Sequence, residues 1–253
     1  MNKLVNCGLE NRFGTNCLKW DGLKSRFGNE NLIAMWVADM DFQAPQPVID
    51  ALKERVNHGI FGYNIIPDSY YEAFINWEKE KHGYNVKKEW IRFSPGVVPA
   101  LFWFINILTN PGDSCIVMEP VYYPFHDAIK ENERKLIFNN LKNDNGIYTI
   151  DFEKFEEDII ENQVKLFILS SPHNPIGRVW TKEELKRVLD ICKANDVFVL
   201  ADEIHQDINM GVRPFISALS IKNKNDYIDK LIVLNSASKT FNLASLLNSH
   251  VII

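Results

Sequence analysis

Short, mostly apolar segments recur along this chain, and a helical pattern separates most of them. They lie at residues 89–93, 115–118, 135–138, 166–169, 197–201, 231–234 and 250–253. A strand that is apolar on both faces is buried between two layers, and parallel strands need a long, usually helical connection. We therefore predict an α/β fold of three layers (αβα) around a mostly parallel, seven-stranded sheet.

Two sequence patterns mark where helices begin. Thr181 and Glu184 have the spacing of a capping box, in which each side chain bonds the other residue's backbone N–H. Ser69 and Glu72 have the same spacing, and this second helix is expected to end at Gly83. The helix after Thr181 presents one apolar face, formed by Leu185, Val188, Leu189 and Cys192.

The N-terminal region has a different pattern. Residues 1–35 contain few periodic apolar positions and several turn signals, so we expect an arm with irregular structure there. From Val48 the apolar residues follow helical spacing, and Gly59 is expected to end that helix.

Composition and charge exclude several classes of protein. Hydrophobic residues make up 46% and charged residues 24% of the chain, which is typical of a globular protein. The net charge of −5, without a basic run, gives no reason to expect nucleic acid as a partner. The longest apolar run, residues 97–108, is too short to cross a membrane, and residues 1–10 lack a signal sequence. We therefore expect a cytoplasmic protein without a membrane partner.

The cysteines and histidines show no ligand spacing. The four cysteines are far apart and form no CxxC pair: Cys7, Cys17, Cys115 and Cys192. The six histidines include no HxxxH pattern. We therefore expect reduced thiols, without a disulfide framework or a metal site.

A lysine follows the apolar run at 231–234. Ser236 and Ser238 lie between this predicted buried strand and Lys239. A lysine at the carboxyl end of a buried strand is poorly solvated, so it can lose its proton near neutral pH and form a Schiff base with an aldehyde. An ordinary surface-loop lysine is the alternative interpretation of this stretch taken alone.

Polar residues follow three other strand candidates. Asn174 comes after the candidate at 166–169, and Asp202 and His205 follow the one at 197–201. Gly96 opens the apolar helix after the candidate at 89–93. In an open parallel sheet, ligands bind at the carboxyl ends of the strands. A helix N-terminus next to such an end has free N–H groups that can bind phosphate.

Pyridoxal 5′-phosphate (PLP) would use all of these features. It needs an amine for its aldehyde, a carboxylate for its ring nitrogen, a donor for its ring oxygen, a stacking surface and a phosphate site. The chain offers this set in Lys239, Asp202, Asn174, Tyr122, and the Gly96 turn with Ser236 and Ser238. Singly, Asp202 also fits a helix N-cap, Asn174 a turn, Tyr122 a core aromatic and Gly96 a simple turn, but jointly these residues favour the cofactor.

Six motifs resemble those of known enzymes. Three are similar to the cofactor motifs of fold-type I PLP enzymes in the aminotransferase class I/II superfamily: residues 171–177 (SPHNPIG), 202–205 (DEIH) and 236–244 (SASKTFNLA). Three resemble the branch of carbon–sulfur lyases that contains the cystathionine β-lyases of MalY/PatB type: residues 36–42 (WVADMDF), 59–63 (GIFGY) and 119–125 (EPVYYPF). The resemblance extends from about residue 15 to residue 253.

The resemblance implies a role for each matching residue. Lys239 would be the Schiff-base lysine and the base that moves the substrate's α-proton. Asp202 would pair with the pyridine nitrogen, and Asn174 would donate to the ring oxygen. His205 stands where many relatives have a tyrosine near that oxygen, although a supporting or core role fits it equally well.

The same resemblance implies the remaining contacts. Tyr122 would stack on the cofactor ring, and Tyr63 would reach the phosphate of the partner in a homodimer. The backbone near Val37 and Ala38 would border the substrate. The phosphate would be held by the backbone N–H groups of Val97 and Val98 and by the hydroxyls of Ser236 and Ser238.

The chain departs from the family pattern at two residues and in its length. Leu247 stands where many aminotransferases have an arginine that binds phosphate, and the lyase branch often lacks that arginine too. Ser245 replaces a common glycine, which requires a backbone with negative φ. Members of the family also continue into a small C-terminal domain with the arginine that binds the substrate carboxylate. We expect this chain to be truncated and to lack that domain and that arginine.

The expected division of the chain follows from this resemblance. Residues 1–45 would form an N-terminal arm and a portion of the small domain. Residues 46–253 would form the large PLP-binding domain, incomplete at its C-terminus.

The resemblance implies a PLP-dependent carbon–sulfur β-lyase. Its substrates would be small amino acids, cystathionine and other cysteine conjugates, from which it would release a thiol, pyruvate and ammonia. A PLP-dependent aminotransferase has the same cofactor residues, so it remains an alternative. A non-catalytic binding or regulatory protein with this fold is the third.

Overall fold

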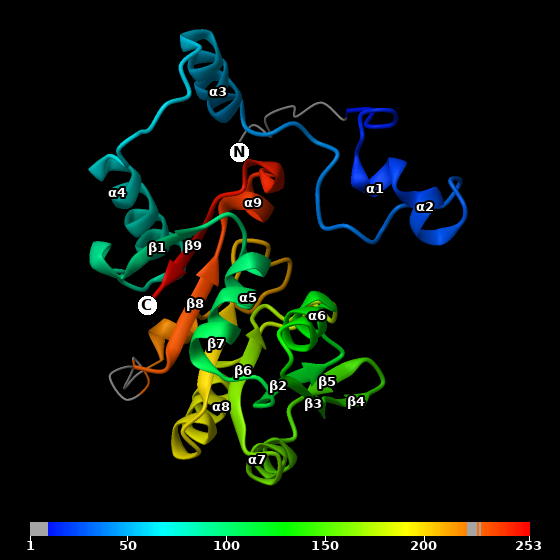
Figure 1. Ribbon diagram of the computed structural model, residues 1–253, viewed down its shortest axis with the longest axis vertical. Coiled ribbons are helices and arrows are strands. Elements are labelled where there is room, and N and C mark those ends of the chain that lie inside the picture. The colour runs from blue at the N-terminus through cyan, green and yellow to red at the C-terminus, as the bar shows by residue number, and fades with distance from the viewer. Residues whose placement is uncertain (1–9, 222–226, 228) are drawn as a thin grey trace. The chain divides into compact units, whose positions relative to one another are not determined.

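The computed structural model describes residues 10–221, 227 and 229–253, which form two compact units (Figure 1). The first unit comprises the described residues up to Ile65 together with Ala237–Leu246. The second comprises Ile66–Ser236 and Leu247–Ile253. The domain boundary predicted at residue 45 rests on family likeness and stays a prediction.

The second unit contains the seven predicted strands in one sheet (Figure 1). They are β1 (Ile91–Ser94), β2 (Ser114–Glu119), β3 (Lys135–Asn140), β6 (Val164–Ser170), β7 (Phe198–Asp202), β8 (Leu231–Asn235) and β9 (Ser249–Ile252). The strand order is β1-β9-β8-β7-β6-β2-β3. Only the pairings of β9 are antiparallel, so the predicted mostly parallel sheet is confirmed.

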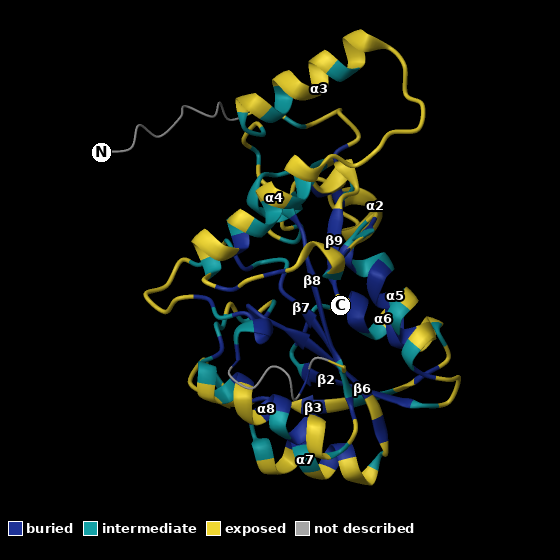
Figure 2. Cartoon of the chain, turned by 90° about the vertical axis from the view of Figure 1, so that its left-hand side faces the viewer, coloured by how far each residue is buried: buried dark blue, intermediate teal, exposed yellow. Residues whose placement is uncertain are grey.

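Helices bury both faces of this sheet, because its strands are apolar on both sides. One core contains side chains of α5 (Val97–Leu108) and α6 (Pro124–Glu131). The core on the other face contains side chains of α7 (Phe152–Glu161) and α8 (Lys182–Ala194). The central strands are buried along most of their length (Figure 2). The predicted three-layer αβα architecture is confirmed.

The capping box at Thr181 is confirmed. The backbone N–H of Glu184 donates to Thr181 Oγ1 at 3.1 Å, and the Thr181 N–H donates to Glu184 Oε2 at 2.8 Å. The four predicted apolar residues of α8 are buried against the sheet.

The capping box predicted at Ser69 is wrong. Helix α4 (Asp68–Trp77) already begins at Asp68, so Ser69 lies inside its first turn. Pro67 is the N-cap, and its extended backbone with ψ of 155° sets the start of the helix two residues earlier than expected. A π-helical turn, Glu78–His82, continues α4 until Gly83, whose left-handed φ of 73° ends the helix as predicted.

The sequence patterns missed a short hairpin in the second unit. It consists of β4 (Lys142–Asp144) and β5 (Ile147–Thr149), which pair antiparallel. Asn145 and Gly146 connect them with φ values of 50° and 90°. Two positive φ values are typical of the Asn-Gly hairpin turn.

The first unit contains short helices where irregular structure was expected. Helices α1 (Leu18–Asp21) and α2 (Leu23–Phe27) lie within the predicted arm, so that expectation is wrong for these residues. Helix α3 (Gln46–His58) ends as predicted at Gly59, which is left-handed with φ of 72°. No residue of α3 is buried (Figure 2). Helix α9 (Ala237–Thr240) carries Lys239.

Several absences are limited to the described residues. Within them, no group of three histidine, cysteine or acidic side chains is placed to hold a metal ion. No helix in the same part of the chain is long and apolar enough to cross a membrane. Cys17, Cys115 and Cys192 are buried free thiols, whereas Cys7 lies outside the described residues.

Candidate active site

The polar strand ends of the second unit meet at one edge of its sheet. Ser170 and Leu234, at the ends of β6 and β8, are the register partners of Asp202 on β7. Ser94 and Asn235, at the ends of β1 and β8, pair with the first two residues of β9. The sheet therefore brings the ends of β1, β6, β7 and β8 to a common edge, as the parallel topology predicts.

Asp202 is a buried carboxylate at this edge, with a residue exposure of 6%. Its Oδ1 accepts a hydrogen bond from the Ile204 N–H at 3.1 Å, so the carboxylate also closes the turn after β7. Tyr122 is half-buried nearby, and burial raises its pKa, with smaller contributions from Tyr123 and from the negative charge of Asp202.

Glu203, the next residue, is fully buried. Its Oε1 accepts a hydrogen bond from the Ala218 N–H at 2.7 Å. Burial raises its pKa to about 8, and the charges of Glu78 and Asp202 act in the same direction. Glu203 is therefore protonated at neutral pH and adds no negative charge at the end of β7.

Replacing Glu203 with glutamine is expected to flatten the pH dependence of stability. The unfolded chain ionises this carboxyl near pH 4.5, whereas the folded chain keeps it protonated up to about pH 8. Its contribution to stability is therefore fully present below pH 4.5 and is lost as the pH rises through about 8, at about 1.4 kcal/mol per pKa unit. Glutamine does not ionise, so the free energy of unfolding of Glu203→Gln should rise relative to that of the parent across this window, by a few kcal/mol in total.

Urea unfolding at several pH values measures this effect. Glu131→Gln, at an exposed position on α6, is the matched control, and its free energy of unfolding should change with pH as that of the parent does. If the free energies of unfolding of the parent and Glu203→Gln changed equally with pH, Glu203 would not be protonated in the folded chain.

Asn174 and His205 lie on two loops that share a cavity. The loop after β6 starts beside Asp202, because the Ser171 N–H donates to the Asp202 carbonyl at 2.9 Å. The Asn174 N–H then donates to Ser170 Oγ at 3.1 Å, which fixes the turn. A cavity of about 540 Å³ is lined by this loop and by residues 205–213, including both Asn174 and His205.

The N-terminus of α5 follows directly from the end of β1. No side chain among the described residues caps it, and Pro99 has no N–H, so the first-turn N–H groups available to an anion are those of Val97 and Val98. A Cβ at Gly96 would lie 3.1 Å from Cδ of Pro99, so only glycine fits here without displacing that ring. At the end of β8, the Ser236 hydroxyl donates to the Asn248 carbonyl at 2.7 Å.

Lys239 belongs to the first unit, where it contacts the segment expected to border the substrate. Its Nζ donates to the Ala38 carbonyl at 2.9 Å. Ala38 is exposed and Val37 half-buried. Ser238 precedes the lysine on α9, and Tyr63, after α3, has a fully exposed side chain.

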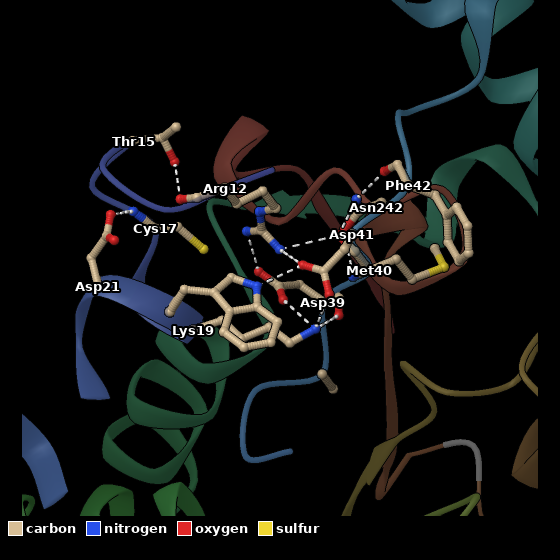
Figure 3. A network of polar contacts seen from close by, with 12 residues as sticks. Arg12, Thr15, Cys17, Lys19, Asp21, Asp39, Met40, Asp41, Phe42 and Asn242 are labelled. Atoms are coloured by element: carbon tan, nitrogen blue, oxygen red, sulfur yellow. Dashed lines mark hydrogen bonds and ion pairs between the residues drawn. The ribbon is translucent and has the colours of Figure 1, made fainter. Parts of the chain in front are cut away.

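An ionic network holds the same segment from another side (Figure 3). Arg12 forms ion pairs with Asp39 at 2.7 Å and with Asp41 at 3.0 Å. Lys19 pairs with Asp41 at 2.8 Å, and the Trp20 indole N–H donates to Asp41 at 2.9 Å. Partial burial alone would raise the pKa of Asp41, but the hydrogen bonds from these three residues lower it to about 2. Asp41 is therefore ionised throughout the physiological range.

The structure thus sorts the predicted site residues into two groups. The second unit holds Gly96, Val97, Val98, Tyr122, Asn174, Asp202, His205 and Ser236. The first unit holds Val37, Ala38, Tyr63, Ser238 and Lys239. The meeting of Lys239 with Asp202 and Asn174 stays a prediction.

Comparison with known protein families identifies the family to which the chain belongs. The family model described as "Aminotransferase class I and II" matches residues 30–246. The chain belongs to the aminotransferase class I and II family.

Individual members of the family are similar over nearly the whole chain. Cystathionine beta-lyase PatB of Bacillus subtilis (strain 168) is 41% identical over 244 residues, which cover 96% of this chain and 62% of PatB. The PLP-bound C-S lyase of Staphylococcus hominis is 38% identical with a TM-score of 0.90, over 97% of this chain and 62% of that one. Cystalysin of Treponema denticola, whose crystal structure contains PLP, is 37% identical with a TM-score of 0.91, over 97% and 62%. The chain therefore spans about 62% of the length of these relatives.

The two departures from the family pattern lie after the lysine. Ser245 is in a 3₁₀ turn, Ala244–Leu246, and is not among the residues with positive φ, so this replacement of glycine needs no strained backbone. Leu247 has a φ of 53°, which is uncommon for a branched side chain.

Three features of the site were missed in the sequence. Nothing in the sequence indicates that Glu203 is buried and protonated. Asp39 and Asp41 bind basic side chains, and the two acidic residues on either side of Met40 are the sequence signal for such partners. The side chain of Asn242 binds the backbone of Met40, a contact that the motif at 236–244 does not indicate.

Proposed function

We propose that the protein of which this chain is a part is a PLP-dependent carbon–sulfur β-lyase. It would act on cystathionine and other cysteine conjugates and release a thiol, pyruvate and ammonia. The observation that carries the proposal is Asp202, a buried carboxylate at the carboxyl end of β7, where the ends of β6 and β8 lie beside it. The similarity to PatB, named a cystathionine beta-lyase, favours this reaction within the family.

The residues of the second unit fit PLP. Asp202 would keep a proton on the ring nitrogen, because a buried carboxylate stabilises a positive charge beside it. Asn174 would donate to the ring oxygen, with His205 near it, and Tyr122 would stack on the ring. The Gly96 turn would admit the phosphate to the N–H groups at the start of α5. The Ser238 hydroxyl would add a donor, and the Ser236 hydroxyl would do so by turning away from the Asn248 carbonyl that it now binds.

The chain's own residues would perform the proton transfers and the positioning. When bound, PLP withdraws electrons from the substrate's α-carbon, which makes the α-proton acidic. Lys239 would remove that proton, and the backbone at Val37 and Ala38 would border the substrate. The C–S bond then breaks, the electron pair leaves with the thiolate, and the remaining dehydro amino acid reacts with water to give pyruvate and ammonia. With cystathionine, the thiol would be homocysteine.

We further propose a homodimer in the cytoplasm, without nucleic-acid or membrane partners. Exposed apolar side chains on α3 and in the segment after it support a second copy as the partner: Leu52, Val56, Ile60 and Phe61. In such a dimer the exposed Tyr63 would reach the phosphate of the other protomer.

Incubation of the PLP-loaded protein with cystathionine tests the proposed reaction. We expect pyruvate and free thiol in equal amounts, because both arise from the same cleavage. Protein without added PLP is the control. A keto acid formed by amino exchange, without pyruvate, would instead identify an aminotransferase. Cofactor binding without turnover of either kind would identify a non-catalytic binding protein.

A further inference from the structure

The side chain of Asn242 is bound to one short segment of the first unit (Figure 3). The Met40 N–H donates to Asn242 Oδ1 at 3.1 Å. The Asn242 amide nitrogen donates to the carbonyls of Met40 at 3.0 Å and Phe42 at 2.9 Å. One amide thus uses its acceptor and both donor hydrogens on the backbone of residues 40–42.

The backbone of Asn242 also explains why asparagine occupies this position. Its φ of 58° lies in the left-handed region, which asparagine enters more readily than most residues with a side chain. Glycine would allow the backbone but lack the amide. Aspartate would keep the acceptor for the Met40 N–H but lose both donors.

Lys239, three residues before Asn242, contacts the same segment. Its Nζ lies 2.9 Å from the carbonyl oxygen of Ala38. The ionic network of Asp39 and Asp41 fixes the residues between Ala38 and Phe42 from another side, and Arg12 also donates to the Met40 carbonyl at 3.1 Å. The position of the Ala38 carbonyl is therefore set by contacts on both sides of the segment.

A free lysine side chain has four rotatable bonds, so its amine samples many positions unless an acceptor holds it. The Ala38 carbonyl is such an acceptor, and it lies in the backbone expected to border the substrate. The carbonyl can hold the amine only if residues 38–42 keep their place relative to α9. Asn242 keeps them there, because it binds residues 40–42 and lies three residues after the lysine.

We propose that Asn242 is a positioning residue for Lys239. It fixes residues 38–42 against the lysine-bearing stretch, so that the Ala38 carbonyl holds the amine of Lys239 beside the substrate-bordering backbone before PLP is attached. This role rests on the proposed function, because it matters only if Lys239 is the lysine that binds PLP.

The three hydrogen bonds of Asn242 to residues 40–42 are called the clamp below. Hydrogen exchange of the cofactor-free protein tests the clamp independently of PLP. In Asn242→Gly, exchange of the Met40 amide should be roughly tenfold faster than in the parent, because that N–H loses its acceptor together with two neighbouring bonds. Asn242→Asp keeps an acceptor at the same place, so it should retain part of the Met40 protection. Asn57→Ala, at an exposed asparagine on α3, is the control and should match the parent.

The second measurement follows how fast added PLP becomes attached to Lys239. Borohydride reduction at successive times fixes the attached fraction, and peptide mass spectrometry locates it. We expect attachment in Asn242→Gly to be roughly tenfold slower, with the same total cofactor bound at saturation, because the amine is less often in the reactive position. A purely structural role would lower the total and leave the rate of the folded fraction unchanged.

Each outcome decides a separate point. Unchanged Met40 exchange in Asn242→Gly would disprove the clamp. Faster exchange with an unchanged attachment rate would disprove the positioning of Lys239. If the parent itself shows no attachment at Lys239, the proposed function fails and the role of Asn242 fails with it, while the exchange result still reports whether the clamp exists.

Discussion

Replacement of Lys239 by alanine should abolish covalent attachment of PLP. The side-chain amine is the group that would condense with the aldehyde, and no other residue of the predicted set carries one. Asp202, Asn174 and the start of α5 remain in the variant, so PLP should still bind, but reversibly and without a link that borohydride can reduce. Turnover of cystathionine should fall to the background level, because the same amine is expected to move the α-proton.

Absorbance and mass spectrometry after borohydride treatment measure this loss. Lys239→Arg is the matched variant, because arginine keeps a positive charge near the Ala38 carbonyl but does not act as a nucleophile. Lys165→Ala, at an exposed lysine of β6, should behave like the parent. A stable link in Lys239→Ala, at any other lysine, would remove this residue from the mechanism.

Replacement of Asp202 by asparagine should reduce the rate of pyruvate formation by about a hundredfold or more, the usual cost of losing one preorganised charged or polar group. The amide oxygen of asparagine can still accept the hydrogen bond that the Ile204 N–H gives to Asp202. The turn after β7 should therefore persist, and the variant should lose only the negative charge that we propose lies beside the ring nitrogen. Without that charge the ring nitrogen loses its proton and withdraws electrons less strongly.

Steady-state kinetics and circular dichroism together test this expectation. The fall should appear in kcat, with a native spectrum and with covalent attachment at Lys239 retained. Asp127→Asn, at an exposed aspartate of α6, is the control. An Asp202→Asn enzyme within tenfold of the parent would contradict the pairing with the ring nitrogen.

The sheet could be predicted from the sequence because its physical cause is local. Strands β2, β7 and β8 are each built around a continuous run of apolar residues, and burial on both faces requires such a run whatever the tertiary contacts are. The edge strands β1 and β3 have shorter apolar runs and exposed residues. The capping box predicted at Thr181 was confirmed for a similar reason, because both of its hydrogen bonds lie within four residues. At Ser69 the same spacing failed, since the geometry of the preceding Pro67 decided where the helix begins.

The features that the sequence did not reveal depend on distant partners. Glu203 is protonated because of burial by the surrounding core, and its neighbours in sequence give no indication of this. The role of Asn242 depends on Met40 and Phe42, about 200 positions earlier in the chain. The β4–β5 hairpin was missed for another reason: its strands are short and mostly exposed, so a search for apolar runs passes over them, although Asn145-Gly146 was a usable signal.

The place of β9 in the sheet has a consequence for biosynthesis. This strand lies between β1 and β8, and among the described residues it is the only strand that pairs with β1. During translation β1 leaves the ribosome long before β9, so it must wait unpaired while the intervening strands assemble. Insertion of β9 then joins the first strand to the others in a single late event. A chaperone that shields β1 during this interval should raise the yield of native protein more than one that binds β3.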